Sequence, residues 1–300
     1  MNRPSHPPMI AFLVAMAGIA TFSAMDAVMK SLVLAIGTYT TLFWRSLAGM
    51  AMSGALFASR NPRRPDKATM KIHAMRGLLG TVMAALFFWG LARVPMAQAI
   101  ALAFIAPLMA LYLAAVILKE HVGPRLIGAS LVAFSGVVVI LVGQAQADLG
   151  RQALLGSIAI LASAGCYAVN IILMRQQSLA APAVEASFFQ SLFMALGMVA
   201  AAPVLGIAPP PLANVPLILL AAFLATTSLL LLSWAYARAQ ASYLATTEYT
   251  SFLWAALFGW LVFGERVSPF TVAGAAAIIG GCLLAARSPE EADPSMEVAA

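Results

Sequence analysis

The chain has 300 residues, of which 62% are hydrophobic and only 9% are charged, and its mean hydropathy is +0.93. A soluble protein cannot bury so much apolar surface, so the composition excludes a soluble fold and indicates an integral membrane protein. The pI near 9.7 would suit nucleic acid, but we expect no nucleic-acid partner, because the basic residues gather where membrane proteins keep their cytoplasmic loops.

Continuous apolar runs of about twenty residues follow one another along the chain. A run of this length crosses about 30 Å of hydrocarbon as a helix, whereas a β-barrel needs short alternating strands. We therefore expect an all-α polytopic membrane protein with ten transmembrane helices. In chain order, the predicted spans are 9–31, 37–58, 72–92, 96–118, 124–143, 152–174, 184–205, 214–236, 241–263 and 268–286.

The connection between the second and third spans is strongly basic. Residues 60–76 read RNPRRPDKATMKIHAMR and carry six Lys or Arg, which places this loop in the cytoplasm by the positive-inside rule. Both termini are then cytoplasmic, and twelve of the 17 basic residues lie inside. We expect a multi-pass protein of the inner or plasma membrane, with a cytoplasmic tail over 1–8 and a disordered one over 287–300. We expect His73, within the basic stretch, to be solvated.

One sequence pattern occurs twice, 145 positions apart. LFFWGLARVP at 86–95 is nearly repeated as LLSWAYARAQ at 231–240, and Gly136 falls on Gly281. The chain therefore divides into two halves of five spans, 9–143 and 152–286, joined by a linker over 144–151. Because five is odd, the second half crosses the membrane in the opposite sense. Such inverted repeats are common in transporters, which bind substrate between the halves.

The repeated pattern places a Trp and an Arg at two helix ends. Trp89 and Arg93 end the third span at the outer face, and Trp234 and Arg238 end the eighth at the inner face. One interpretation is an interfacial aromatic belt with snorkelling arginines. The other is that the two tryptophans cover the mouths of a transport pathway.

The sequence also resembles the drug/metabolite transporter superfamily, specifically its ten-helix EamA-like family. The residues that carry the resemblance are Leu91-Ala92-Arg93-Val94-Pro95, Ala97, Ala99, Ala101, Pro107, Leu118-Lys119-Glu120, Gly128 and Gly136-Val137, and then Tyr236-Ala237-Arg238-Ala239, Ser242, Gly264-Glu265, Gly274 and Gly280. The second half departs from the pattern, because Phe252 stands where a mid-helix proline is expected. The resemblance implies transport by alternating access, with a central cavity lined by both halves.

Ionisable residues within spans are the candidate site residues, because burying them in hydrocarbon costs several kcal/mol. Asp26 and Lys30 share a face of the first span, and Arg45 lies at a similar depth in the second. We expect Asp26 to pair with Arg45, Lys30 or both. The pair would either fix the two helices together or form a charged patch that binds a polar or zwitterionic substrate.

The second half offers neutral polar groups at the corresponding places. Gln190 replaces Arg45, and Tyr167 and Asn170 lie near the position of Asp26. Glu248, followed by Tyr249, lies in the ninth span, where an unpaired carboxylate could carry a proton. Hydrogen bonds to neighbouring threonines or to Arg238 are the structural alternative for Glu248. Glu120 and Glu265 are expected to be structural charges in helix-end loops.

These observations favour a secondary transporter that moves a small organic metabolite, such as an amino acid or a related amphipathic compound, by alternating access in the export direction. A multidrug or cation exporter is the alternative within transport, and a non-transporting membrane assembly subunit is the alternative from another class. No enzyme motif, ATP-binding motif or metal-ligand cluster is found, so we expect no cofactor, and coupling to protons or ions stays open. The expected partners are a small-molecule substrate and the lipid bilayer, for a monomer or homodimer.

Overall fold

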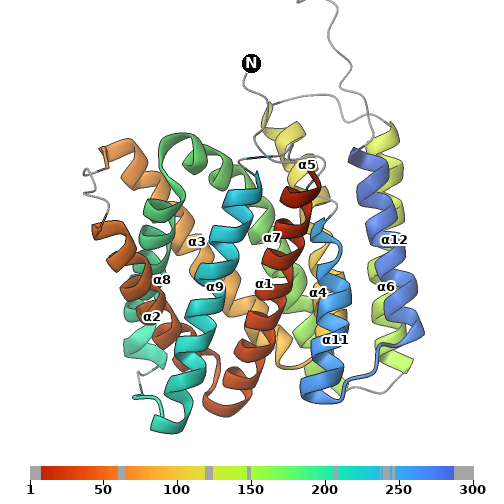
Figure 1. Cartoon of the computed structure of the whole chain (residues 1–300). Coiled ribbons are helices and arrows are strands. Elements are labelled where there is room, and N and C mark those ends of the chain that lie inside the picture. Colours follow the sequence, from red (N-terminus) through yellow and green to blue (C-terminus); the bar gives the residue numbers. More distant parts are fainter. Residues whose placement is uncertain are drawn as a thin grey trace, which may run out of the picture.

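The computed structural model describes residues 8–59, 65–118, 124–146, 150–205, 208–236, 238, 244 and 247–286. The secondary structure of this part is helical, which confirms the predicted all-α class (Figure 1). The helices are α1 (Pro8–Ile36), α2 (Thr38–Ala58), α3 (Lys67–Leu91), α4 (Met96–Ala103), α5 (Ala106–Leu118), α6 (Pro124–Gln146), α7 (Gly150–Ala180), α8 (Ala183–Leu205), α9 (Val215–Tyr236), α11 (Ser251–Phe263) and α12 (Pro269–Ala286), with the 3-10 turn η1 (Leu212–Asn214) before α9. The C-terminal tail, residues 1–7 and Glu120 lie outside the described residues.

Length and composition suit the helices to a bilayer. Among the described residues, α1, α3, α7, α8 and α9 are each long and apolar enough to cross a membrane, and shorter apolar helices cover 96–110, 127–143, 251–263 and 269–284. Large apolar side chains such as Leu131, Leu253 and Trp260 point outward, with 61–66% of their surface exposed. An outer surface of this kind is stable against lipid tails and not against water.

The two repeats are interleaved and do not form separate bundles. α1 of the first half packs along α9 of the second half. The equivalent helices make the reciprocal contact, in which α7 of the second half packs along α3 of the first. α2 packs on its own counterpart α8, and α6 packs on its own counterpart α12, so these two pairs straddle the pseudo-two-fold axis (Figure 1). This pattern confirms the predicted architecture of two inverted repeats.

The fourth predicted span, 96–118, is broken. α4 ends at Ala103 and α5 begins at Ala106, with a turn at Phe104 and Ile105. Pro107 follows the turn and has no N–H to donate to a helical hydrogen bond, which explains the break. The amide of Ile105 bonds only to the carbonyl three residues back, at 3.4 Å.

The ninth predicted span is broken at the equivalent place, although Phe252 stands where the first half has Pro107. Residues Tyr249 and Thr250 form the turn before α11. The hydroxyls of Thr247, Thr250 and Ser251 each donate to the carbonyl oxygen three residues earlier, at 2.6 Å. Such side-chain hydrogen bonds compete with the helical pattern. The same break is thus built from hydroxyl groups in place of a proline.

The two breaks contact each other. Phe104 and Tyr249 are 145 positions apart, and their rings lie edge to face with centroids 5.5 Å apart. Because they are equivalent residues of the two repeats, this contact lies at the pseudo-two-fold axis.

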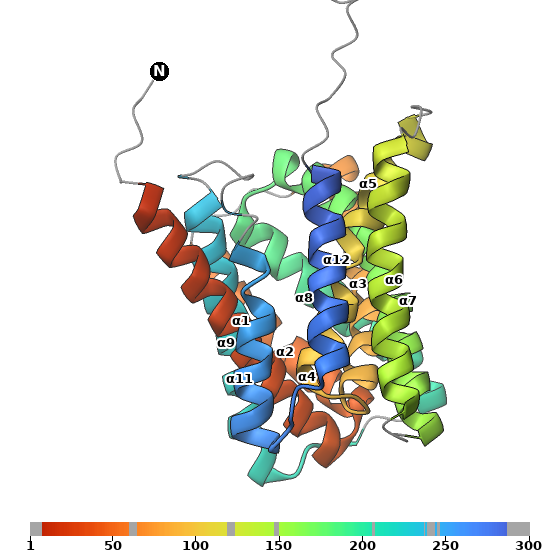
Figure 2. The same ribbon diagram turned by 90° about the vertical axis from the view of Figure 1, so that its right-hand side faces the viewer.

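Glycines allow α6 and α12 to cross closely at the edge of the bundle (Figure 2). A Cβ on Gly281 would lie 2.7 Å from the carbonyl oxygen of Ala129 and 2.9 Å from the amide nitrogen of Ala133. The neighbouring Gly280 has no atom within 4 Å of the same position. Close backbone approach at small residues is how helices associate in lipid.

Candidate functional site

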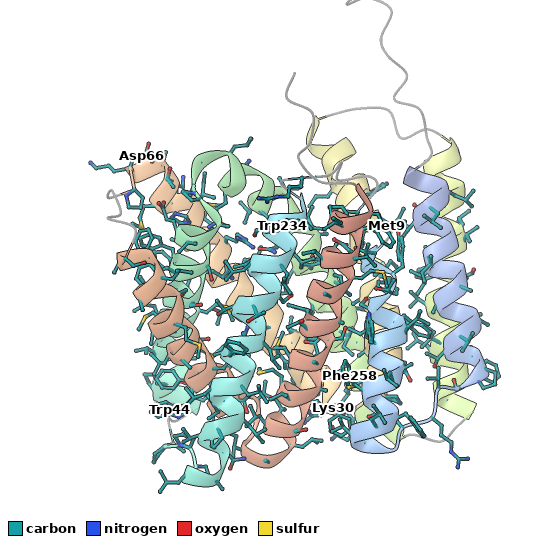
Figure 3. All side chains as sticks on the ribbon, in the orientation of Figure 1. Met9, Lys30, Trp44, Asp66, Trp234 and Phe258 are labelled. Carbon is teal, nitrogen blue, oxygen red and sulfur yellow. The ribbon has the colours of Figure 1, made fainter. Side chains whose placement is uncertain are left out.

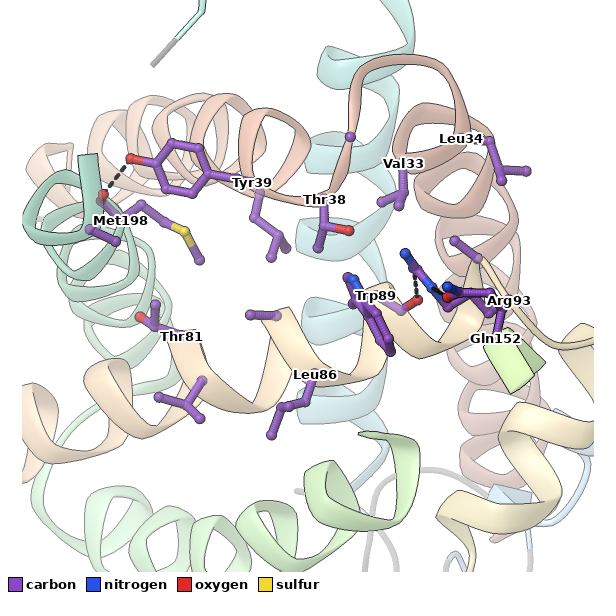
Figure 4. A pocket seen from close by; sticks show the side chains of 16 residues that line it. Val33, Leu34, Thr38, Tyr39, Thr81, Leu86, Trp89, Arg93, Gln152 and Met198 are labelled. Carbon is purple, nitrogen blue, oxygen red and sulfur yellow. Dashed lines mark hydrogen bonds between the residues drawn. The ribbon is translucent and has the colours of Figure 1, made fainter. Parts of the chain in front are cut away.

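A cavity of about 940 Å³ lies between α1, α2, α3 and α8, at the end of the bundle where α1 and α3 terminate (Figure 4). The predicted topology makes this the outer end. Most of the wall is apolar, with Tyr39, Trp89 and Arg93 among the larger side chains. The lining residues are Val33, Leu34, Gly37, Thr38, Tyr39, Leu42, Thr81, Val82, Ala85, Leu86, Trp89, Ala92, Arg93, Gln152, Met198 and Ala201.

The repeated Trp–Arg pairs adopt the same geometry in both halves. The Arg93 guanidinium lies 3.6 Å from the centroid of the Trp89 ring and donates to the Trp89 carbonyl at 2.7 Å. Arg238 lies 4.1 Å from the centroid of Trp234 and donates to its carbonyl at 3.1 Å. Trp234 lies at the opposite end of the bundle from Lys30 (Figure 3), whereas Trp89 stands in the cavity wall. This position fits the pathway interpretation for Trp89, whose role in binding stays a prediction.

Asp26 and Arg45 lie deeper in the bundle than the cavity residues of their helices, with Asp26 buried and Arg45 half-buried. Asp26 is 1% exposed, and Arg45 is the charged residue that acts on it electrostatically. Asp26 precedes the cavity residue Val33 by seven positions on the same face of α1, about 10 Å deeper. Arg45 follows the cavity residue Leu42 by one turn of α2.

Several polar atoms of this pair and of other residues on α1, α2 and α8 lack hydrogen bonds within the described part of the chain. Both carboxylate oxygens of Asp26 and the Nε atom of Arg45 are buried without a partner, as are the hydroxyls of Ser23, Thr41 and Ser46 and the Oε1 atom of Gln190. Each unpaired buried polar group costs about 1–3 kcal/mol. Proteins leave few such groups without reason, so these atoms are candidates for contacts with polar ligand groups.

Lys30 contacts a different carboxylate from the one we expected. Its ammonium forms an ion pair with Glu265 and donates to the carbonyl of Val94 at 2.7 Å, and Glu265 also accepts from the Met96 amide at 2.7 Å. The expected Lys30–Asp26 pair is therefore not formed. Glu265 stands in the loop after α11 and makes structural contacts, in keeping with the sequence prediction, because α1 packs beside α11 and brings Lys30 to this loop (Figure 1).

A second polar group, which we call the inner network, joins α3, α7 and α8 near the end opposite the cavity. His73 contacts Oε1 of Glu185 through Nε2 at 3.1 Å, and contacts Nε2 of Gln177 through Nδ1 at 2.5 Å. Arg76 donates to Oε1 of Gln177 and, at 3.3 Å, to Oδ1 of Asn170. The expectation that His73 is solvated is wrong, because its side chain is 0% exposed.

The burial of His73 has a simple physical reason. α3 begins at Lys67, capped by Asp66, so the basic stretch is already helical there. The face that carries His73 packs on α7 and α8, and the imidazole stacks on the Phe189 ring with centroids 4.7 Å apart. The signal that could have identified this face is the glycine at position 77, one turn further along.

Of the remaining predicted site residues, Asn170 belongs to the inner network, and Tyr167 and Glu248 are linked to it electrostatically. The Tyr167 hydroxyl is within electrostatic reach of both Arg76 and Glu248. Glu248 itself is exposed, and Tyr249 packs on Phe104 at the helix breaks. The structure therefore separates Asp26 and Arg45, near the outer cavity, from Tyr167 and Asn170, beside Arg76. Sequence reasoning missed Arg76 and Gln177.

Comparisons with known proteins agree with one another. Residues 9–142 and 154–287 each match the EamA-like transporter family. A riboflavin transporter of Rhizobium johnstonii is 32% identical over 95% of this chain and 93% of its own length. A pseudopaline exporter of Pseudomonas aeruginosa is 23% identical over 92% of this chain and 95% of its own length. One crystal structure, 20% identical, superposes with a TM-score of 0.61 over 93% of this chain and 98% of its own. That last likeness concerns the fold alone.

Proposed function

The chain belongs to the EamA-like transporter family, and from this premise we propose that it exports a small organic metabolite across the inner membrane by alternating access. The observation that carries the proposal is the Asp26–Arg45 pair near the cavity, in which both carboxylate oxygens of Asp26 and Nε of Arg45 are buried without a protein partner in the described part of the chain. A gradient of protons, ions or the substrate itself would supply the energy.

The chemistry of the site supports an amphipathic substrate. The Asp26 carboxylate and the Arg45 guanidinium can bind an ammonium and a carboxylate, and Gln190 can add a neutral hydrogen bond. The cavity wall above them offers the rings of Tyr39 and Trp89 to an apolar or aromatic body. Amino acids and related amphipathic compounds combine these two properties.

The relatives support transport without fixing the cargo. Their names assign riboflavin to one and pseudopaline export to another, so this fold serves more than one substrate, and the substrate is decided by the site. Riboflavin therefore belongs among the compounds to be tested directly. A lone-cation exporter is less well supported, because Arg45 and Arg93 place positive charges beside the proposed route.

Metabolite profiling of cells and medium tests the proposal. Cells would carry the unchanged chain, Asp26→Asn or no transporter, with equal membrane amounts of the two proteins. We expect one compound class to move outward with the unchanged chain and at least about tenfold more slowly with Asp26→Asn, because one charge-assisted contact is lost. Equal movement by both proteins would remove Asp26 from the site.

A charge swap separates a structural from a substrate-binding pair. If Asp26 and Arg45 only hold α1 against α2, the double variant Asp26→Arg with Arg45→Asp should regain the folding and transport that each single substitution loses. If they bind substrate, the swapped protein should fold and fail to transport. Export can also be measured from proteoliposomes that contain the purified chain and are filled with cell extract. If no compound leaves them, transport by this chain alone is refuted. A reporter fused after residue 286 checks the proposed cytoplasmic C-terminus.

A further inference from the structure

The inner network has one consistent arrangement of donors and acceptors. Arg76 can only donate, so the amide oxygen of Gln177 must face it. The amide nitrogen of Gln177 then faces His73 Nδ1 at 2.5 Å and donates to it. Nδ1 must therefore carry a lone pair, and the ring proton sits on Nε2, where it is donated to Glu185 at 3.1 Å. In this arrangement His73 is neutral and Glu185 accepts the hydrogen bond from its Nε2.

A second proton on His73 is incompatible with this arrangement. Protonated Nδ1 becomes a donor and meets the donating amide nitrogen of Gln177. If the Gln177 amide turns over to offer its oxygen, its nitrogen then faces the guanidinium of Arg76, which is again donor against donor. The network can therefore keep either the Arg76–Gln177 hydrogen bond or a proton on Nδ1, but not both.

The charged and polar groups of the network around the imidazole can be identified element by element. α8 contributes the carboxylate of Glu185, and the next turn of α3 contributes the guanidinium of Arg76. α7 contributes the amides of Gln177 and Asn170 and the hydroxyl of Tyr167, which is electrostatically linked to Glu248. Lys71 of α3 is exposed, and the side chain of Arg175 of α7 lies outside the described residues. α1 and α2 carry Lys30, Asp26 and Arg45, and Lys30 lies at the other end of the bundle (Figure 3).

The network lies where an inner closure would have to be. His73 is about two turns from Asp66, at the end of α3 opposite Trp89 and the cavity (Figures 3 and 4). Its hydrogen bonds join α3 of one repeat to α7 and α8 of the other. In a transporter that opens alternately to the two sides, contacts that close one end must break before that end opens.

The pseudo-symmetry argues against a purely structural role. The positions 145 residues after His73 and Arg76 are Ile218 and Ala221 on α9, and both are buried. The positions 145 residues before Asn170 and Gln177 are Met25 and Leu32 on α1, also buried. The same helix–helix contact is thus made with apolar side chains in the other half. Packing alone does not require a buried histidine and arginine at this place.

We propose that His73 is the proton-binding site of this transporter, and that a proton on its Nδ1 atom releases the inner closure between α3 and α7. The proposal rests on the transport function proposed above, and names its coupling ion and the residue that binds it. Histidine is suited to this task because its charge changes between pH 5 and 8. The neutral state keeps the Arg76–Gln177 hydrogen bond between α3 and α7, and the protonated state breaks it.

Nitrogen NMR of the purified protein tests the first half of the proposal. The chain has three histidines, and the His73 signal is identified by its loss in His73→Phe. At pH 8 we expect His73 to be neutral with its proton on Nε2. A proton on Nδ1 at pH 8 would refute the donor pattern, and an imidazole that stays neutral down to pH 5 would refute the proton site.

Distance measurement between spin labels tests the second half. Labels at Lys71→Cys on α3 and Leu179→Cys on α7, in a chain with both natural cysteines replaced by alanine, use two exposed positions outside the network. We expect a short distance at pH 8 and a growing longer population at pH 5.5. No change with pH, or an unaltered change in His73→Phe, would overturn the proposal.

The most specific variant is Gln177→Glu. It replaces the amide nitrogen by an oxygen of nearly the same size, so the side chain accepts from protonated His73 and from Arg76 at once. We expect its closure to persist at pH 5.5, the opposite of the unchanged chain, and opening at pH 5.5 would contradict the argument. These measurements need no substrate. If the spin-label distance responds to pH as expected but no transported compound is found, the result counts against the proposed function and not against the proton site.

Discussion

The α6–α12 crossing leads to a prediction about two neighbouring glycines, in which Gly281→Ala is compared with Gly280→Ala. A Cβ on Gly281 meets three atoms of Ala129 and Ala133 at 2.7 to 2.9 Å, whereas ordinary contacts begin at 3.4 Å. The helices must therefore separate by about half an ångström or more, and overpacking of this kind costs about 1–3 kcal/mol. A Cβ on Gly280 meets nothing within 4 Å.

The comparison cancels the effect of helix propensity. Both substitutions gain about 1 kcal/mol because alanine favours a helix more than glycine does. The difference between the two variants is then the overpacking cost alone, about 1–3 kcal/mol. At about 2 °C per kcal/mol for a chain of this size, thermal unfolding in detergent should show Gly281→Ala melting about 2–6 °C below Gly280→Ala. Equal melting temperatures would mean that α6 and α12 do not cross at these residues.

Three further predictions concern charged groups. Glu265→Gln leaves Lys30 buried without its counter-ion, so we expect thermal unfolding to show a loss of about 3 kcal/mol in the free energy of unfolding. Adding Lys30→Met should recover part of this loss, and no recovery would refute the pairing of Lys30 with Glu265. Glu248→Gln should keep the pH response of the spin-label distance, because Glu248 is exposed; a lost response would place the proton on Glu248. Hydrogen bonds from the Thr69 side chain and its backbone N–H hold the pKa of Asp66 below its ordinary value, so ionised Asp66 stabilises α3 above pH about 4 and this effect is lost as the pH falls further. The melting difference between the unchanged chain and Asp66→Ala should therefore be present at pH 7 and shrink below pH about 4, and a difference independent of pH would contradict this.

The spans and the repeat could be predicted because hydropathy and spacing are local properties of the sequence. The break in the fourth span could also be expected, since Pro107 stands inside it. The equivalent break before α11 could not, because Phe252 removes the only familiar marker. Its cause is a set of three hydroxyls, whose choice between solvent, neighbours and their own backbone is decided by tertiary packing.

The candidate site was predicted in part. Asp26 and Arg45 could be identified because a charge inside an apolar run is rare, and their depths could be counted along two consecutive helices. The sequence leaves Arg45 and Lys30 as alternative partners of Asp26, and it does not reveal the partner of Lys30, because that carboxylate lies 235 positions away and no local pattern relates the two. His73 was misjudged from the charges beside it in sequence, whereas its burial depends on which face of α3 packs on α7 and α8.

The interleaving of the repeats also has a consequence for biosynthesis. When the first half has left the ribosome, α1 still lacks α9, α3 lacks α7, and α6 lacks α12. Lys30 enters the membrane long before the carboxylate that neutralises it has been translated. The first five spans therefore cannot complete their packing until the last helix is inserted, and until then they are loosely assembled or bound to the insertion machinery. An ancestor with a single repeat could have satisfied the same contacts only by pairing with a second copy in the opposite orientation.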